Sequence, residues 1–276
     1  MTNNLEVTKD REPWWELSAI PDLTAGKVAI TFIGTNQYLD FFPNYYSQIE
    51  KFFLPNSEKV FLVFTDGEID DPPDNVKVFH QEHLEWPYIT LKRFEIINKA
   101  RSIIKDCDWL VFLDADTLVV KEFKEAEFLF RCCNADIDST PLFGVHHPCH
   151  NMRMKPHDEE PGAYDQNPES EAYVDMDDED FEFKAVPYIQ GCFWGGRIPA
   201  VLGMIDELEA RVNRDLEKGV VALWHDESHL NKYLTEHEFA FHIFGPEFAF
   251  PEVFRDHCNF KPRIVHLQKD NSAYQI

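Results

Sequence analysis

The chain has 276 residues, of which 44% are hydrophobic and 14% aromatic, and it carries a formal net charge of −24 at pH 7. This length suits one large α/β domain with an ample core, and we expect a single catalytic domain over residues 1–276. So acidic a chain is poorly suited to nucleic acid or to an anionic membrane surface as its main partner. An anionic substrate would require a metal ion or local basic residues that offset this field.

The start of the chain lacks the features of a targeting segment. Residues 1–26 form an expected N-terminal extension that begins MTNNLE, with no basic region followed by an apolar one. The longest apolar runs are too short to span a membrane. The six cysteines include no C-x-x-C pair, which favours reduced thiols. The sequence therefore predicts a soluble, cytoplasmic protein without a membrane anchor.

Segments of strand character alternate with segments of helical character along the chain. The expected strands are residues 27–34, 59–66, 75–80, 108–116, 141–147 and 186–196. The expected helices are residues 38–53 (with Pro43 in the first turn), 90–104 (capped by Thr90), 199–218 and one that starts near residue 224. This alternation predicts an α/β fold with a central, mostly parallel sheet, in which ligands bind at the carboxyl ends of the strands.

Two aspartates, Asp114 and Asp116, follow the apolar run WLVFL at the end of an expected strand. Alternate side chains of an extended chain point the same way, so both carboxylates can address one ligand. Mg²⁺ and Mn²⁺ are typically held by one or two carboxylates together with substrate phosphates. We therefore expect a divalent metal at this pair. The segment VFLDADTLV also resembles the first motif of haloacid-dehalogenase-type phosphatases, but Leu118 stands where that family needs threonine.

The segment WHDESHLNKY, residues 224–233, carries two histidines, two carboxylates, an amide and an ammonium group. Burying so many ionisable groups is costly unless each finds a partner, so the segment indicates a site. At the start of a helix, adjacent side chains lie on different faces. Asp226 and Glu227 are therefore expected to perform different tasks.

Three other segments each allow more than one interpretation. The run HHPCH at residues 146–150 could suggest zinc, but adjacent residues at a strand end face opposite ways, which favours a substrate-facing loop. The glycines of GCFWGG, residues 191–196, fit either a tight turn or close approach of the backbone to a sugar ring. Residues 157–182 contain twelve Asp and Glu with no Lys or Arg, which predicts a solvated acidic loop. A calcium site there is disfavoured because the spacing of an EF-hand loop is missing.

Taken in order, these motifs resemble the family 6 glycosyltransferases. That family comprises retaining α-1,3-galactosyl- and N-acetylgalactosaminyltransferases, including the blood-group A and B enzymes. The segment WHDESHLNKYL (224–234) is close to a family signature. The other matching segments are VFTD (63–66), TLKRFEII (90–97), DAD (114–116), TPLFGVHHP (140–148), PESEAYV (168–174) and QGCFWGG (190–196). The resemblance covers roughly residues 27–270.

The resemblance implies a GT-A fold, which is a Rossmann-like nucleotide-sugar transferase fold, and a UDP-sugar donor. It implies that Asp114 and Asp116 carry Mn²⁺ (or Mg²⁺) and that Glu227 faces the reacting anomeric carbon. The implied donor-binding residues are Tyr38, Asp66, Arg93, Asp114, Asp226 and Lys269. Sugar selectivity is assigned to Gln190, Gly191 and Cys192, and acceptor binding to His147, Trp224 and Glu227.

Several positions depart from the family pattern. Gln190 and Cys192 differ from the small or aliphatic residues of the animal enzymes, and Cys149 replaces a glycine of the same pocket. In the expected C-terminal tail, residues 268–276, Lys269 is kept, but Gln275 stands where the family usually has a basic residue. We expect no animal-type stem or membrane anchor, as in the soluble bacterial and phage-borne members.

We therefore expect a soluble, metal-dependent retaining glycosyltransferase. It would move a hexose (galactose, N-acetylgalactosamine or a related sugar) from a UDP donor to an oligosaccharide acceptor with α linkage. Two alternatives remain at this point: a phosphohydrolase that uses Asp114 and Asp116, and a non-catalytic sugar-binding module. The sequence leaves the oligomeric state open, as it does the choice between a covalent Glu227 intermediate and a same-face ion pair.

Overall fold

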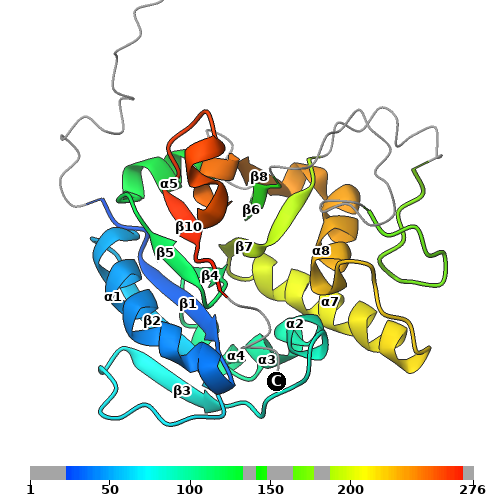
Figure 1. The fold of residues 1–276 in the computed structure, drawn as a ribbon, viewed down its shortest axis with the longest axis horizontal. Helices are drawn as coiled ribbons and strands as arrows, with labels where there is room; N and C mark the ends of the chain where they lie inside the picture. Colours follow the sequence, from blue (N-terminus) through cyan, green and yellow to red (C-terminus); the bar gives the residue numbers. More distant parts are fainter. Residues whose placement is uncertain (1–22, 133–140, 148–163, 177–186, 270–276) are drawn as a thin grey trace, which may run out of the picture.

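The computed structural model describes residues 23–132, 141–147, 164–176 and 187–269. At its centre lies a seven-stranded sheet in the order β3-β2-β1-β4-β7-β6-β8 (Figure 1). Its strands are β1 (Lys27–Ile33), β2 (Glu58–Thr65), β3 (Val76–His80), β4 (Trp109–Leu113), β6 (Leu142–His146), β7 (Ile189–Arg197) and β8 (Phe241–Phe244). Only β7 runs antiparallel to its neighbours, so the predicted α/β fold with a mostly parallel sheet is confirmed.

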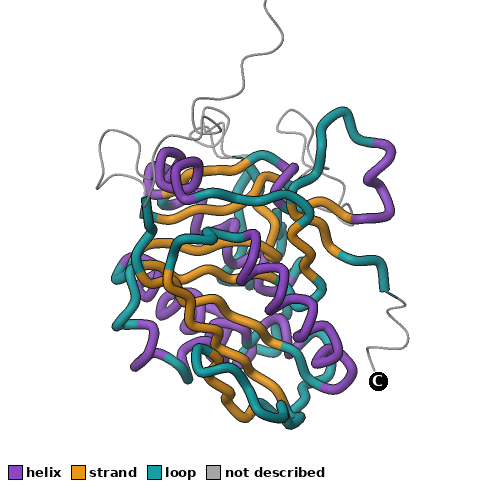
Figure 2. Tube along the Cα trace, turned by 90° about the vertical axis from the view of Figure 1, so that its left-hand side faces the viewer, coloured by secondary structure: helices purple, strands orange, loops and turns teal. Residues whose placement is uncertain are grey.

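Helices cover both faces of this sheet (Figures 1 and 2). They are α1 (Phe42–Phe52), α2 (Tyr88–Leu91), α3 (Arg93–Asn98), α4 (Arg101–Ile104), α5 (Glu125–Cys132), α7 (Ala200–Glu217) and α8 (His225–Glu236). Alternate residues of β1 belong to different cores: Val28 and Ile30 pack with α1, whereas Ala29 packs with α3 and α7. This alternation follows from the two-residue period of a strand. Within the described residues, no helix has the length and apolar character needed to cross a membrane.

The single helix predicted for residues 90–104 is wrong. The chain forms α2, α3 and α4 instead, with breaks at Lys92 and Ala100, whose φ and ψ angles lie near −90° and +10°. Thr90 lies inside α2, where its hydroxyl donates to the carbonyl of Pro87 rather than capping a helix. Similarly, the helix predicted from residue 38 begins only at Phe42, after the 3₁₀-helix η2 (Asn36–Phe41). Because of the break at Lys92, Arg93 begins a new helix.

A second, three-stranded sheet brings the C-terminal part of the chain back to the centre. It consists of β5 (Thr117–Val119), β10 (Ile264–His266) and β9 (Phe250–Pro251), in that order. Of three short 3₁₀-helices, η3 (Glu238–Ala240) leads from α8 into β8, η4 (Pro246–Phe248) connects β8 to β9, and η5 (Glu252–His257) follows β9 on the way to β10. The β10 strand is antiparallel to β5, with His266 opposite Thr117. Next to this pair, the Leu267 N–H donates to the Asp116 carbonyl at 2.9 Å.

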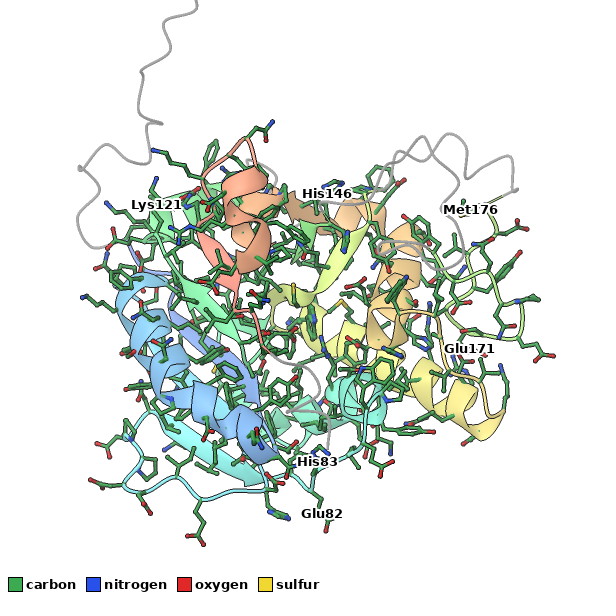
Figure 3. The ribbon with its side chains drawn as sticks, in the orientation of Figure 1. Glu82, His83, Lys121, His146, Glu171 and Met176 are labelled. Carbon is green, nitrogen blue, oxygen red and sulfur yellow. The ribbon has the colours of Figure 1, made fainter. Side chains whose placement is uncertain are left out.

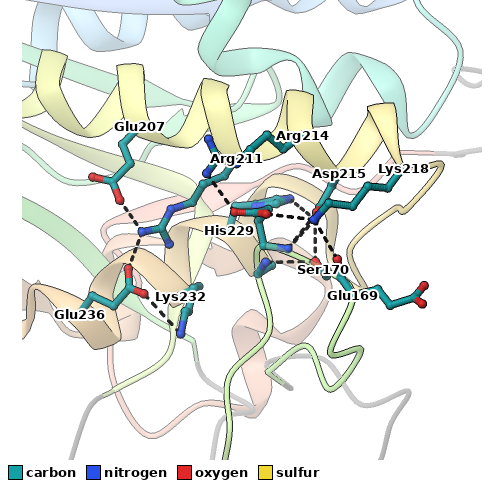
Figure 4. A network of polar contacts seen from close by, with 12 residues as sticks. Glu169, Ser170, Glu207, Arg211, Arg214, Asp215, Lys218, His229, Lys232 and Glu236 are labelled. Carbon is teal, nitrogen blue, oxygen red and sulfur yellow. Dashed lines mark hydrogen bonds and ion pairs between the residues drawn. The ribbon is translucent and has the colours of Figure 1, made fainter.

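Within the acidic stretch, the structure describes residues 164–176, which form a loop with Glu169 and Asp175 exposed but are not solvated throughout. Asp165 is only 3% exposed, and its carboxylate accepts the Leu223 N–H at 2.7 Å. Asp215 of α7 accepts the Ser170 hydroxyl at 2.7 Å and the Glu171 N–H at 2.8 Å (Figure 4). Residues 157–163 and 177–182 lie outside the described residues. The acidic segment therefore packs on α7 and on the chain that enters α8, with Glu171 and Met176 marking its course in Figure 3.

Candidate functional site

The larger candidate cavity, with about 750 Å³ of empty space against about 470 Å³ in a second one, lies at the carboxyl ends of β1 and β4, where the α/β rule places ligands. Tyr38 of η2 forms part of its wall, and the Lys269 ammonium lies 4.7 Å from the centre of the Tyr38 ring. His83, labelled in Figure 3, lines the cavity from the loop between β3 and α2. The cavity is lined by Ile33, Thr35, Tyr38, His83, Leu84, Trp86, Ile89, Thr90, Arg93, Phe112, Asp114, Ala115, Asp116 and Lys269.

Asp114 and Asp116 line the floor of this cavity directly after β4. Asp116 is 6% exposed, and one of its oxygens lies 2.6 Å from the Lys269 ammonium, while the other lies 3.4 Å from Nδ1 of His266. Burial acts to raise the pKa of Asp116, but the hydrogen bonds and charges of His266 and Lys269 outweigh it and lower that pKa to about 2. Asp116 is therefore ionised at neutral pH.

The same carboxylates fit a divalent cation. One ligand atom from each of Asp114, Asp116 and His266 lies within 4.8 Å of the other two. Carboxylates suit Mg²⁺ and Mn²⁺, and imidazole is a ligand for many divalent ions. Among the described residues, this is the group of acidic, histidine and cysteine side chains that meets such a spacing. Of the HHPCH segment, His146 and His147 are described at the end of β6, and residues 148–150 lie outside the described residues.

Arg93 joins this cavity to a second one. Its guanidinium lies 2.9 Å from the Asp226 carboxylate and 3.5 Å from that of Asp114. It also donates to the Gly191 carbonyl at 2.5 Å and lies 4.4 Å from the centre of the Phe112 ring. With a side chain only 8% exposed, Arg93 is held from several sides and carries its positive charge where the two cavities meet.

The second, smaller cavity is lined by the first turn of α8 and by β7. Both Asp226 and Glu227 reach it, and both approach Gly191, whose N–H donates to the Glu227 carboxylate at 2.6 Å. The two carboxylates thus converge on one glycine, contrary to the expectation that they face different ways. His225 has a φ of 53°, and this left-handed backbone starts the helix next to them. The cavity is lined by Thr90, Arg93, Asp114, Gly191, Cys192, Trp224, His225, Asp226 and Glu227.

The burial of this cavity favours the neutral form of its two carboxyl groups. Burial raises the pKa of Asp226 to about 7, although the nearby Arg93 guanidinium acts to lower it. Burial likewise raises the pKa of Glu227 to about 7, against the lowering effect of the Gly191 N–H. A positive charge that enters the cavity would favour the ionised form of both groups. The site is therefore suited to receive a positive charge.

Asn231 fixes the position of Glu227 relative to β7. Its amide accepts the Ile189 N–H and donates to the Ile189 carbonyl, each at 2.8 Å. The same amide donates to the Glu227 carbonyl, one turn earlier in α8, at 2.9 Å. Asn231 is fully buried, so these bonds do not compete with water. The helix that carries the carboxylates is therefore tied to the strand that carries Gly191.

Three of the predicted site residues lie outside both cavities. Asp66 accepts the backbone N–H of Asn36 at 2.8 Å, so it supports the turn that leads into Tyr38. Gln190 is 7% exposed, and its amide donates to the carbonyls of His146 and Ala249. His147 packs edge-on against Tyr188, with ring centres 5.9 Å apart. Of the predicted selectivity residues, only Gly191 and Cys192 line the smaller cavity.

Sequence reasoning missed His83, Asn231 and His266. His83 accepts or donates a hydrogen bond with the Thr35 hydroxyl at 2.9 Å within the larger cavity wall. Asn231 was included in the dense polar segment, but no signal in the sequence pointed to its contact with Ile189. His266 follows a short β-rich run near the C-terminus, and its distance of 150 residues from Asp116 hid the pairing.

Comparison with known proteins assigns this chain to a family. The sequence model of Glycosyltransferase family 6 matches residues 19–274. The chain is a family 6 glycosyltransferase. The predicted resemblance is thereby confirmed, and the mostly parallel sheet with its cavities at the strand ends is the expected GT-A-like fold.

The transferase is similar to mammalian and bacterial members of this family. It is 26% identical over 262 residues to Histo-blood group ABO system transferase 2 of Rattus norvegicus, covering 89% of this chain and 70% of that one. It is 28% identical over 252 residues to O-antigen biosynthesis glycosyltransferase WbnI of Escherichia coli, covering 90% and 97%. It is 22% identical over 234 residues to Globoside alpha-1,3-N-acetylgalactosaminyltransferase 1 of Homo sapiens, covering 82% and 61%. The protein is thus an enzyme of glycosyl transfer.

Proposed function

We propose that this transferase moves a hexose from a UDP-sugar to a saccharide acceptor with retention of the α configuration and with the help of Mn²⁺ or Mg²⁺. The hexose is galactose, N-acetylgalactosamine or a related sugar. The observation that carries the proposal is the junction of the two cavities, which share Thr90, Arg93 and Asp114. A nucleotide diphosphate in the larger cavity would point its sugar past this junction toward Glu227.

The larger cavity has the groups that a nucleotide diphosphate needs. Tyr38 offers an aromatic surface for a base, while Lys269 and Arg93 carry positive charge toward a diphosphate. Asp114 and Asp116 would hold the divalent cation, which when bound neutralises charge on the departing diphosphate. Arg93 can serve the sugar as well, because its ion pair with Asp226 fixes both side chains at the entrance of the smaller cavity.

In the smaller cavity, Glu227 is placed to face the anomeric carbon. Loss of the diphosphate leaves positive charge on that carbon, and a buried carboxylate stabilises it. The Gly191 N–H holds the Glu227 carboxylate in place, and Asp226 is left to orient a hydroxyl of the donor sugar. Trp224 borders the same cavity from the position before α8 and would contact the acceptor. A carboxylate on that face preserves the α configuration whether it attacks or only stabilises charge.

Membership of a glycosyltransferase family weighs against the phosphohydrolase alternative. A phosphohydrolase would act on phosphate monoesters and would not depend on the sugar of a UDP-sugar. A non-catalytic sugar-binding module would have no use for two buried carboxyl groups whose pKa values are raised to about 7. Both alternatives predict no sugar transfer.

A panel of UDP-sugars tests the proposal. Each is incubated with the protein and Mn²⁺, with and without a saccharide acceptor such as lactose or a fucosylated disaccharide, and UDP release and product are measured. We expect acceptor-dependent release with at least one UDP-hexose, loss of that release with EDTA and recovery with Mn²⁺. Transfer that persists after exhaustive chelation would contradict the proposed metal dependence. Release of inorganic phosphate alone would contradict the proposed sugar transfer.

A further inference from the structure

His266 is held beside the two aspartates by the backbone of the second sheet. It is the last residue of β10, opposite Thr117 in the antiparallel pair with β5, and Asp116 immediately precedes β5. The next residue, Leu267, donates its N–H to the Asp116 carbonyl at 2.9 Å. The backbone that carries the imidazole is therefore fixed by hydrogen bonds to the segment that carries Asp116.

The imidazole lies next to the two carboxylates. Its Nδ1 lies 3.4 Å from an Asp116 oxygen, and its side chain is 14% exposed. One ligand atom from each of Asp114, Asp116 and His266 lies within 4.8 Å of the others. Ligand atoms on opposite sides of a small divalent ion lie about 4 Å apart. A small rotation of one side chain is enough for all three to reach one ion.

The negative charges of Asp114 and Asp116 already have basic partners other than His266. The Lys269 ammonium lies 2.6 Å from the second Asp116 oxygen, and Arg93 lies 3.5 Å from Asp114. Neither an ammonium nor a guanidinium can bind a metal, since neither has a free lone pair. Of the basic groups that the structure describes around the two aspartates, only His266 offers a ligand atom.

We propose that His266 is a third protein ligand of the divalent cation, in addition to Asp114 and Asp116. This inference rests on the metal-dependent transfer proposed above and deepens it. A nitrogen ligand has a chemical consequence, because imidazole favours later transition metals over Mg²⁺. The site should therefore bind Co²⁺ and Mn²⁺ better than Mg²⁺ before any nucleotide is present.

Pulsed electron paramagnetic resonance of Mn²⁺ bound to the full chain, without nucleotide, tests the ligand directly. We expect modulation from a directly bound imidazole nitrogen in the wild-type protein and its loss in His266→Asn. In the same variant, Co²⁺ affinity should fall at least about tenfold, whereas Mg²⁺ affinity should change much less, because the asparagine amide still offers an oxygen. His242→Asn on β8 is the matched control, since that histidine lines neither cavity, and it should keep the modulation and the affinities.

The outcomes separate this inference from the proposed function. Oxygen-only coordination of Mn²⁺ in the wild-type protein, with unchanged Co²⁺ affinity in His266→Asn, would overturn the role of His266 while Mn²⁺-dependent transfer persisted. Transfer that needed no metal, with Asp114→Asn binding Mn²⁺ as tightly as the wild type, would instead contradict the metal site itself. Circular dichroism of each variant shows whether it is folded, and a double variant of His266 and Asp114 should bind no more tightly than Asp114→Asn alone.

Discussion

The Glu227 carboxylate accepts the backbone N–H of Gly191 at 2.6 Å. This bond connects the first turn of α8 to the middle of the sheet, and it brings the carboxylate to the cavity that lies past Arg93 and Asp114. A backbone N–H in a strand has no side-chain rotamers, so it fixes the carboxylate more firmly than the end of a long, flexible side chain would. The proposed chemistry depends on this placement.

Replacing Glu227 with glutamine tests the charge. The amide is nearly the same size as the carboxylate, but it cannot stabilise positive charge on the anomeric carbon, so kcat should fall by about two to four orders of magnitude. UDP affinity should change little, because UDP is assigned to the larger cavity. Steady-state transfer assays and calorimetric titration with UDP give the two values. A variant that transfers sugar at a near-normal rate would remove Glu227 from the chemistry.

Replacing Gly191 with alanine tests the placement. The added Cβ would lie 3.1 Å from the Glu227 Cβ, 3.3 Å from its carboxylate oxygen and 3.4 Å from an Asp226 oxygen. The two Glu227 contacts are tighter than ordinary van der Waals contacts, so Glu227 must shift by a few tenths of an ångström, whereas the Asp226 contact is an ordinary one. We therefore expect kcat to fall at least about tenfold with UDP affinity retained. Gly203→Ala on α7 is the control, because its Cβ would meet nothing within 4 Å. Equal rates in the two variants would contradict the placement.

Asn231→Asp tests the link between α8 and β7. The aspartate keeps the shape but loses the amide that donates to the Ile189 and Glu227 carbonyls, so oxygen would face oxygen in a buried space. The first turn of α8 should shift, and kcat should fall at least about tenfold while the KM for the donor changes less. Thr235→Val is the matched control, since that buried hydroxyl bonds only within α8, to Lys232. If both variants lose the same activity, Asn231 stabilises α8 as a whole and does not specifically position Glu227.

Acid should destabilise the protein through His229. Burial lowers the pKa of this fully buried histidine to about 4, although the Asp215 carboxylate acts to raise it (Figure 4). In the unfolded chain the group takes up a proton near pH 6.5, while in the folded chain it stays neutral until about pH 4. The stability from His229 is therefore complete above about pH 6.5 and is lost as the pH falls toward 4, by up to about 1.4 kcal/mol per pH unit.

Urea unfolding at pH 7.5 and pH 5 measures this effect. The free energy of unfolding of His229→Gln should fall less between the two pH values than that of the wild type, even if the variant is less stable at both. His242→Gln serves as a comparison, because burial also lowers the pKa of His242 to about 4. Identical pH dependence in wild type and His229→Gln would show that His229 titrates normally in the fold.

The strands and the acidic pair could be predicted because their signals are local. An apolar run that ends in Asp114 is sufficient to place that residue at a strand end, and the structure has it directly after β4. The break at Lys92 could not be predicted, because the apolar residues on both sides keep helical spacing and only tertiary contacts of Arg93 favour the turn.

Other parts of the site depend on contacts between distant segments. Asn231 bonds to Ile189 across 42 residues, and Lys269 bonds to Asp116 across 153. No periodicity within a short window carries such pairings. The composition of the acidic stretch does not show its partners either. The Asp165 carboxylate accepts the Leu223 N–H, and the Glu171 carboxylate is held by Arg214 of α7 and by Lys218 just after that helix.

The stereochemistry of the product tests the central claim most directly. A UDP-α-hexose that supports turnover is incubated with the enzyme, Mn²⁺ and an acceptor, and the new anomeric linkage is read from the proton coupling constant in NMR. A carboxylate on the face of the anomeric carbon opposite the diphosphate predicts an α-linked product. A β-linked product would contradict retention and with it the role assigned to Glu227.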